Sequence, residues 1–169
     1  MHETIEDIES LQDILDKSRV VGGRHLGSIF SDDVQMSSVD LIAELDSVFE
    51  MHVGCLTTDG SPLVAPVDGI LFKGKIWFGF PGPAVRAKLI RQDPRISASY
   101  QRGKSFAFIV HGQAVEVEET GSLFAEYFDC LKGLYTGLYG PRWIDWYHKQ
   151  EKTGGYNGFI EPRRMFAKR

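Results

Sequence analysis

The sequence has few cysteines and no long hydrophobic run. Cys55 and Cys130 are the two cysteines among 169 residues, one in a strand-like run and the other in a helical run. Two such residues make no disulfide framework, so we expect both thiols to be reduced and to pack as small core side chains. No apolar run approaches the roughly 20 residues that cross a bilayer, which predicts a soluble protein with no membrane partner.

Positive charge is also scarce. The formal net charge is −4 and the isoelectric point is about 5.7. Broad nucleic-acid binding requires a cationic surface that displaces counterions from phosphates, so this balance argues against it. The first 17 residues, "MHETIEDIESLQDILDK", are acidic and amphipathic, and they lack the cationic start and unbroken apolar segment of a secretion signal. We therefore expect a cytoplasmic protein.

Familiar catalytic and metal-binding signatures are missing. The five histidines have no close metal-ligand spacing, there is no paired-cysteine motif, and no Gly-rich phosphate loop follows a strand. No metal site is therefore predicted. His52 and His111 lie in predicted strands, where a structural role is favoured over ligand contact. Nothing resembles a nucleophile elbow, although a hydrolase triad assembles in space and stays open as an alternative.

A chain of 169 residues is long enough for one core and too short for two ordinary domains, so we expect a single domain. Runs of β-branched and aromatic residues with Gly-containing turns between them predict six strands. The runs cover residues 48–58, 62–72, 71–80, 95–101, 105–119 and 156–166, and the turn signals are Asp59-Gly60-Ser61, Lys73-Gly74 and Arg102-Gly103-Lys104. Consecutive hairpins favour an antiparallel sheet. Closing that sheet into a small barrel would remove its exposed edges.

Helical spacing predicts three or four helices around these strands. The predicted helical stretches are residues 3–17, residues 39–45 after Ser37 or Ser38, a short basic helix after Pro81-Gly82-Pro83, and residues 122–150 with a break at Gly137–Pro141. Residues 20–38 read as a connection with one short strand. The fold class is therefore α+β, with a helical extension at 1–46, a barrel core at 47–119, and helices plus a closing strand at 120–169.

The basic helix is the one feature that indicates a binding site. Gly82 is expected to cap it and Pro83 to occupy its first position. Helix N-termini present free N–H groups and a partial positive charge, and Arg86 in the first turn adds a full charge, so the sequence predicts an anion site. Taken alone, an ordinary amphipathic helix with Val85, Leu89 and Ile90 facing inward is the favoured interpretation.

The order of these segments resembles the pyridoxamine 5'-phosphate oxidase-like family of flavin-binding split β-barrels. The similar segments are "GCLTTDGSPLVAPVDGILFKGKIWFGF", "PGPAVRAKLIRQDPRISASY" and "HGQAVEVEE", from about residue 51 to residue 119. A weaker similarity is found at "FIEPRRMF". The resemblance implies a six-stranded antiparallel split β-barrel with flanking helices. It also implies a homodimer with FMN in clefts between the subunits.

The resemblance further implies which residues contact the cofactor. The second strand would lie along the flavin ring and ribityl chain, and the end of the third strand and the basic helix would approach the phosphate. The implied residues are Val64, Ala65, Pro66, Val67, Phe78, Gly79, Phe80, Arg86 and Lys88. Trp143, Trp146 or Tyr139 would form a cleft wall, although packing of a helix onto the barrel is the favoured role for these rings.

Two departures set this chain apart from the oxidases that act on pyridoxamine phosphate. Those enzymes use an adjacent Arg-Lys pair, whereas Ala87 separates Arg86 from Lys88 here. The tail "PRRMF" has basic residues without the tryptophan of that family. Vitamin B6 oxidation is therefore not implied, whereas general flavin binding is.

The expected function is an FMN-dependent oxidoreductase that acts on a small organic substrate, since the cofactor supplies the chemistry. One alternative is a reductase that uses the deazaflavin coenzyme F-420, whose longer acidic tail needs additional cations, with Arg91, Arg95, Arg102 and Lys104 as candidates. Another is a flavin or haem carrier without enzymatic activity, in which His52, His111 or His148 would be the axial ligand. The catalytic residues are unknown, and Tyr100, Tyr139 and His148 are candidates for a general acid.

Overall fold

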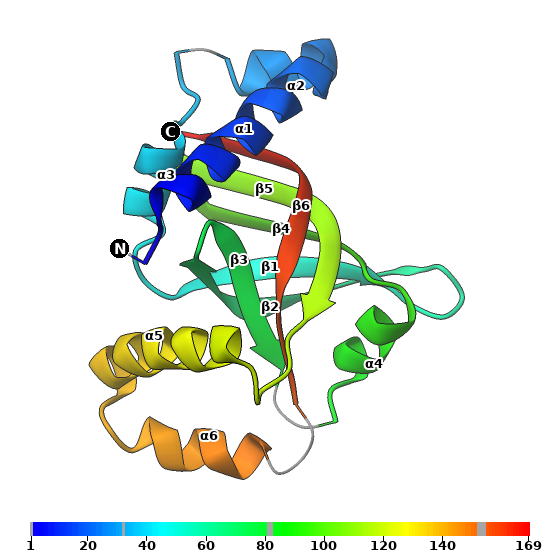
Figure 1. The fold of residues 1–169 in the computed structure, drawn as a ribbon. Helices are drawn as coiled ribbons and strands as arrows, with labels where there is room; N and C mark the ends of the chain where they lie inside the picture. Colours follow the sequence, from blue (N-terminus) through cyan, green and yellow to red (C-terminus); the bar gives the residue numbers. More distant parts are fainter. Residues whose placement is uncertain (1, 32, 81–82, 152–154) are drawn as a thin grey trace.

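Six antiparallel strands close into a barrel in the computed structural model, which describes residues 2–31, 33–80, 83–151 and 155–169. The strands are β1 (Phe49–Leu56), β2 (Pro62–Phe72), β3 (Lys75–Phe80), β4 (Arg95–Arg102), β5 (Phe106–Glu116) and β6 (Tyr156–Lys168). Their order around the barrel is β1-β2-β3-β6-β5-β4, and β1 pairs with β4 to close it (Figure 1). The predicted fold class is confirmed.

Short hairpins fix which residues face each other across the first three strands. Lys73 (φ 50°) and Gly74 (φ 68°) both have positive φ, as a type I′ turn requires, and this turn places Phe72 opposite Lys75. In the β1–β2 hairpin, Glu50 lies opposite Asp68. These two carboxylates share the outer face of the barrel.

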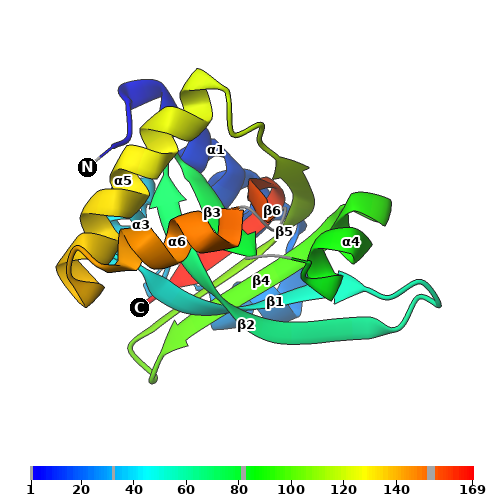
Figure 2. The same cartoon turned by 90° about the horizontal axis from the view of Figure 1, so that it is seen from below.

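Alternation along the strands divides the apolar side chains into two clusters. The first fills the barrel and includes Met51, Val53 and Phe108, each 0% exposed. The second lies outside the barrel, where Trp77 of β3 and Phe159 of β6 meet helix α5 (Ser122–Tyr139) and helix α6 (Trp143–Glu151). Figures 1 and 2 show α5 and α6 together on one side of the barrel. The second cluster therefore attaches a helical layer to the barrel wall.

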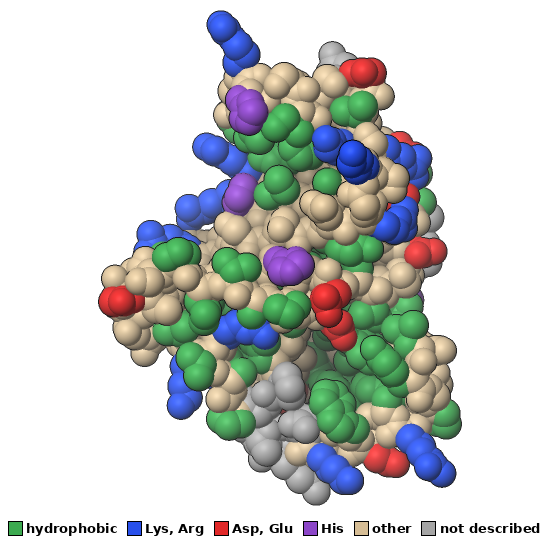
Figure 3. Space-filling view, turned by 180° about the vertical axis from the view of Figure 1, so that it is seen from behind, with side chains coloured by type: hydrophobic (Ala, Val, Ile, Leu, Met, Phe, Trp, Pro, Cys, Tyr) green, Lys and Arg blue, Asp and Glu red, His purple; other side chains and the backbone are tan. Residues whose placement is uncertain are grey.

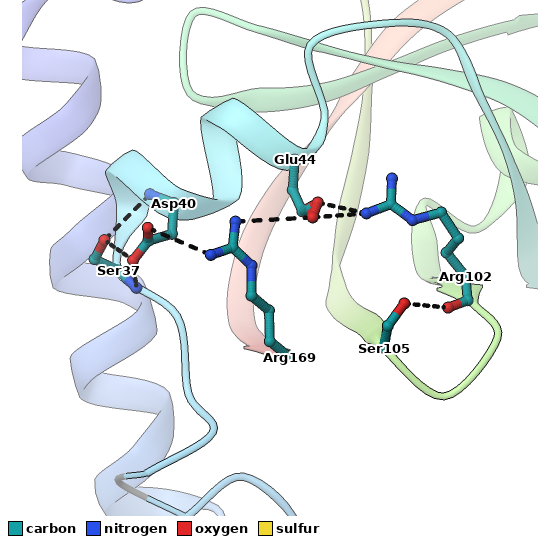
Figure 4. A network of polar contacts seen from close by, with 6 residues as sticks. All are labelled: Ser37, Asp40, Glu44, Arg102, Ser105 and Arg169. Carbon is teal, nitrogen blue, oxygen red and sulfur yellow. Dashed lines mark hydrogen bonds and ion pairs between the residues drawn. The ribbon is translucent and has the colours of Figure 1, made fainter.

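Two N-terminal helices cover another part of the barrel. Helix α1 (Ile5–Val21) and helix α3 (Ser38–Glu44) each begin with a capping box, formed by Thr4 with Asp7 and by Ser37 with Asp40. Glu44 then accepts hydrogen bonds from Arg102 at the end of β4, and Arg169 lies between Asp40 and Glu44 (Figure 4). This network ties α3 to the β4–β5 turn.

Residues 20–38 differ from their prediction. Helix α2 (Gly23–Ile29) occupies the segment, and the expected short strand is reduced to an isolated bridge between Gln35 and Lys168. Helix α1 also continues to Val21, beyond its predicted end at residue 17. With α2 and helix α4 (Val85–Gln92), the described residues contain six helices rather than three or four. Within those residues, no helix combines the length and apolar character needed to cross a membrane.

Candidate functional site

A pocket of about 370 Å³ lies between the barrel and the α5–α6 layer. Its described lining residues are Glu50, Pro66, Val67, Asp68, Ile70, Gly79, Phe80, Arg86, Glu119, Tyr127, Leu131, Tyr135, Trp143, Trp146, Tyr147, Gly155 and Asn157. They come from β1, β2, β3, α4, α5, α6 and β6, except that Glu119 follows β5 and Gly155 precedes β6. Figure 3 shows a hollow on this face, with hydrophobic side chains around it and charged side chains at its rim. The strands and the helical layer thus each contribute one side of the pocket.

One side of the pocket is an aromatic wall, formed by Tyr127, Tyr135, Trp143, Trp146 and Tyr147. Tyr127 and Tyr135 lie eight residues apart on α5, so they share one helix face. The Tyr127 ring stacks on Trp77 with ring centroids 4.3 Å apart. Trp143 is buried, whereas Trp146 is 53% exposed. The wall is therefore anchored at its base and open at its rim.

Two tyrosines of the wall stay neutral across the physiological pH range. Burial raises the pKa of Tyr127 far above its ordinary value. Burial, reinforced by a hydrogen bond to Asp68, raises the pKa of Tyr135 in the same way. The Tyr135 hydroxyl donates to Oδ2 of Asp68 at 2.5 Å. Asp68 is thereby held against the wall as a hydrogen-bond acceptor.

Charge is unevenly distributed around the pocket. Its described lining contains three carboxylates, from Glu50, Asp68 and Glu119, and one guanidinium, from Arg86. Glu119 accepts a hydrogen bond of 3.0 Å from Nδ2 of Asn157. Glu50 has no ion pair or hydrogen bond from its side chain to any described residue, and it is exposed. The described lining therefore has one cationic position and is otherwise neutral or acidic.

Arg86 provides that position from the first turn of α4. Its Nη1 donates to the carbonyl oxygens of Ala65 and Pro66, at 3.2 and 3.1 Å. Its guanidinium also lies 4.4 Å from the centre of the Phe80 ring. No described carboxylate pairs with it, and burial lowers its pKa. A half-buried guanidinium without an acidic partner is a favourable place for an anion.

The start of α4 differs in detail from its prediction. The helix begins at Val85 with Ala84 as its N-cap, not at Pro83, and the expected cap Gly82 lies outside the described residues. Ala84 is extended, and its carbonyl accepts the first helical hydrogen bond, from Ala87. Val85 is 67% exposed rather than inward, because Ala87, Leu89 and Ile90 form the buried face. Arg86 still lies in the first turn.

The structure brings five of the nine predicted cofactor residues to this pocket, namely Pro66, Val67, Gly79, Phe80 and Arg86. Ala65 contributes its carbonyl to Arg86. Val64 lies beside a separate groove, Phe78 is 1% exposed in the barrel core, and Lys88 is exposed on α4 away from the described pocket lining. Val64 shares the outer face of β2 with Pro66 and Asp68, but it lies nearer the β1–β2 turn, where it borders the separate groove.

Gly79 on β3 leaves room for the side chain of Asn157 on β6. A Cβ atom at this position would lie 2.8 Å from Oδ1 of Asn157 and 3.1 Å from the carbonyl oxygen of Tyr156. Glycine therefore allows Asn157 to approach β3. Asn157 can then reach both the pocket and Glu119.

The other predicted candidates lie outside the described lining of the pocket. Three of the four additional arginines and lysines are paired: Arg91 with Glu116, Arg95 with Asp93, and Arg102 with Glu44. Neither the three candidate haem ligands, His52, His111 and His148, nor the candidate acids Tyr100 and Tyr139 are among the described lining residues. His111 instead shares a hydrogen bond of 2.8 Å with Ser97. No three metal-ligating side chains converge anywhere in the described ranges.

Sequence reasoning missed the acidic side of the pocket and most of the aromatic wall. In the sequence, Glu50 and Asp68 have the pattern of ordinary exposed charges. The β1–β2 register, which places them opposite each other, is known only from the structure. The spacing of Tyr127, Leu131 and Tyr135 at intervals of four residues was a usable signal for one helix face. Helical spacing alone does not say which part of the barrel that face covers.

No family model matches the chain, and no curated protein matches it. Solved structures do. A conserved hypothetical protein from Mycobacterium tuberculosis superposes with a TM-score of 0.65 at 20% identity, over 81% of this chain and 87% of that one. A FAD-binding protein from Mesorhizobium loti gives 0.56 at 15% identity, over 79% and 93% of the two chains. A candidate pyridoxamine 5'-phosphate oxidase from Listeria innocua gives 0.56 at 12% identity, over 75% and 94%.

The chain has the split-barrel fold of the pyridoxamine 5'-phosphate oxidase-like proteins. The same split barrel is present in a heme storage protein from Vibrio cholerae, with a TM-score of 0.60, and in an F-420 reductase, with a TM-score of 0.53. At 12% and 18% identity these likenesses concern the fold. Split barrels of this kind thus carry flavin, deazaflavin and haem ligands in different proteins, so the ligand of this one must be argued from its own pocket.

Proposed function

We propose that this split barrel binds FMN in the pocket between the barrel and the α5–α6 layer, and that it is an oxidoreductase acting on a small organic substrate. Bound FMN would supply the transfer of a hydride or of single electrons. The chain's own residues would position the cofactor and exclude water. Activity toward vitamin B6 is not proposed, because Ala87 separates the two cations that are adjacent in those oxidases.

The single observation that carries the proposal is the position of Arg86. Its guanidinium is half-buried in the pocket lining, lacks an acidic partner among the described residues, and lies in the first turn of α4. The partial positive charge at the N-terminus of α4 and the guanidinium together favour one phosphate group. The carbonyl and Phe80 contacts hold the guanidinium in place before the phosphate arrives.

The aromatic wall supports the assignment of the other half of the ligand. A flavin ring is large, flat and largely apolar, and stacking on aromatic side chains stabilises such rings. Tyr127 and Trp143 are 2% and 7% exposed, so they form a rigid surface for a ring.

Two features favour FMN over the other ligands found in this fold. Haem requires an axial ligand, and no histidine is among the described residues that line the pocket. The deazaflavin coenzyme carries a longer acidic tail, and Arg91, Arg95 and Arg102 are already neutralised by carboxylates. A single phosphate matches the one guanidinium in the described lining.

We further propose that the outer face of β1 and β2 pairs with a second copy of the chain. Val64 on this face is 61% exposed, and it borders a groove of about 750 Å³ that also contains Arg163 and Arg164. An exposed apolar side chain beside arginines that have no ion pair with a described residue suits a surface that is covered in a dimer. A second copy there would also shield the open side of the FMN pocket from water.

One chromatographic experiment tests binding and assembly together. The protein saturated with FMN is separated by size, and light scattering and flavin absorbance are recorded on the same peak. We expect the mass of two chains and one FMN per chain. Val64→Glu is expected to give the mass of one chain, whereas Val39→Glu, at an exposed valine on α3, leaves the dimer intact. A wild-type peak with the mass of one chain would refute the dimer, and a peak without flavin would refute the cofactor.

A further inference from the structure

Two carboxylates of the pocket face each other directly across a strand pair. Glu50 of β1 is the register partner of Asp68 of β2, and both side chains lie on the outer face of the barrel. Like charges directly opposite each other on an antiparallel pair destabilise the sheet. The Tyr135 hydroxyl donates to Asp68, but Glu50 has no cationic partner among the described residues. The pair is therefore an uncompensated negative site.

The aromatic wall surrounds the same part of the pocket. Tyr127, Tyr135, Trp143, Trp146 and Tyr147 line the cavity together with Glu50 and Asp68. The faces of tyrosine and tryptophan rings attract organic cations, most strongly where the cation is partly removed from water. Since Tyr127 and Tyr135 stay protonated, the wall contributes ring faces rather than phenolate charges. Aromatic faces next to these two carboxylates favour the binding of an ammonium group.

We propose that this part of the pocket selects a positively charged substrate, an organic amine or a protonated nitrogen heterocycle. The proposal rests on the proposed function, because FMN is assigned to the Arg86 side of the pocket and the substrate to the Glu50–Asp68 side. Three carboxylates and one guanidinium in the described lining disfavour a second anion once the FMN phosphate has bound to Arg86. An ammonium group would neutralise the opposed carboxylates and lie against Tyr135 and the exposed Trp146, whereas the flavin ring would lie on Tyr127 and Trp143.

The test compares choline with its neutral isostere 3,3-dimethylbutan-1-ol, which has the same shape without the charge. Both are titrated into FMN-saturated protein and into protein freed of cofactor, with tryptophan fluorescence and calorimetry as readouts. Choline is expected to bind at least about tenfold more tightly than the alcohol. Equal affinities, or no measurable binding of choline, would overturn the proposal.

Matched variants assign that preference to the pocket. Glu50→Gln is expected to weaken choline binding by about fivefold or more and to leave the alcohol unchanged. Glu161→Gln is the control, since this carboxylate pairs with Lys75 and is not among the described lining residues. Trp146→Leu should reduce choline binding by removing a ring face. Equal effects of Glu50→Gln and Glu161→Gln would contradict the assignment.

The same titrations separate this proposal from the proposed function. Arg86→Ala removes the one described cation of the pocket, so it should weaken FMN binding while strengthening or preserving the binding of choline. If FMN does not bind but choline is still preferred over the alcohol, the cofactor assignment fails and the cation site stands. If FMN binds and choline shows no preference, the cation site fails alone.

Discussion

Replacing Arg86 with alanine is expected to weaken FMN binding by about ten- to a hundredfold, which corresponds to about 1.5–3 kcal/mol. The reason is the loss of charge-assisted hydrogen bonds to the phosphate at a half-buried position. Riboflavin, which has the same ring and no phosphate, should lose much less. The measurement is a fluorescence titration of cofactor-free protein with each ligand.

Two other cations on α4 serve as controls for that variant. Arg91→Ala should leave FMN affinity nearly unchanged, because Glu116 already neutralises this guanidinium and it is not part of the described lining. Lys88→Ala is expected to weaken binding by less than about fivefold, as is typical of an exposed charge. Equal losses for FMN and riboflavin in Arg86→Ala would contradict a phosphate site. Thermal unfolding of each variant shows whether the fold is retained.

Replacing Trp77 with alanine is expected to lower the free energy of unfolding by about 3–5 kcal/mol. Trp77 is 1% exposed, its Nε1 donates to the carbonyl oxygen of Phe72 at 3.0 Å, and its ring stacks on Tyr127. The substitution removes the buried ring together with its hydrogen bond and its stacking contact, and it leaves a cavity beneath α5. Urea unfolding followed by circular dichroism measures the loss. Because Tyr127 belongs to the aromatic wall, FMN affinity should fall as well.

Trp146→Ala is the matched control, since it makes the same change at a side chain that is 53% exposed. We expect it to change stability by less than about 1 kcal/mol. Trp77→Phe keeps a ring in the cluster and provides a folded variant if Trp77→Ala is too unstable to study. Similar losses in Trp77→Ala and Trp146→Ala would show that the second cluster does not hold the helical layer on the barrel.

The strands and hairpins were largely predictable because their signals are local. The run 62–72 coincides with β2, and Lys73-Gly74 forms the turn that its sequence indicated. The position of α2 was not predictable in the same way, since its seven residues bury no side chain and carry no amphipathic pattern. The expected start of α4 was wrong by two residues, because Pro83 fits a first helical position without requiring one.

The candidate site was predictable only in part, because it depends on contacts between distant segments. Arg86 was identified from its place on a basic helix, and the structure adds the carbonyls of Ala65 and Pro66 that hold it. The opposed pair of Glu50 and Asp68 follows from strand register, which the sequence constrains only through the hairpin. The position of the aromatic wall depends on how α5 packs on β3, a non-local contact.

Identification of the small molecule carried by the native protein tests the central claim most directly. The protein is purified without added cofactor, its absorption spectrum is recorded, and the released ligand is identified by mass spectrometry. If purification strips the cofactor, the colourless protein is titrated with FMN. The account predicts the flavin absorption bands and the mass of FMN, or saturable FMN binding by the stripped protein. A haem absorption band, the mass of a deazaflavin, or a colourless protein that does not bind added FMN would contradict it.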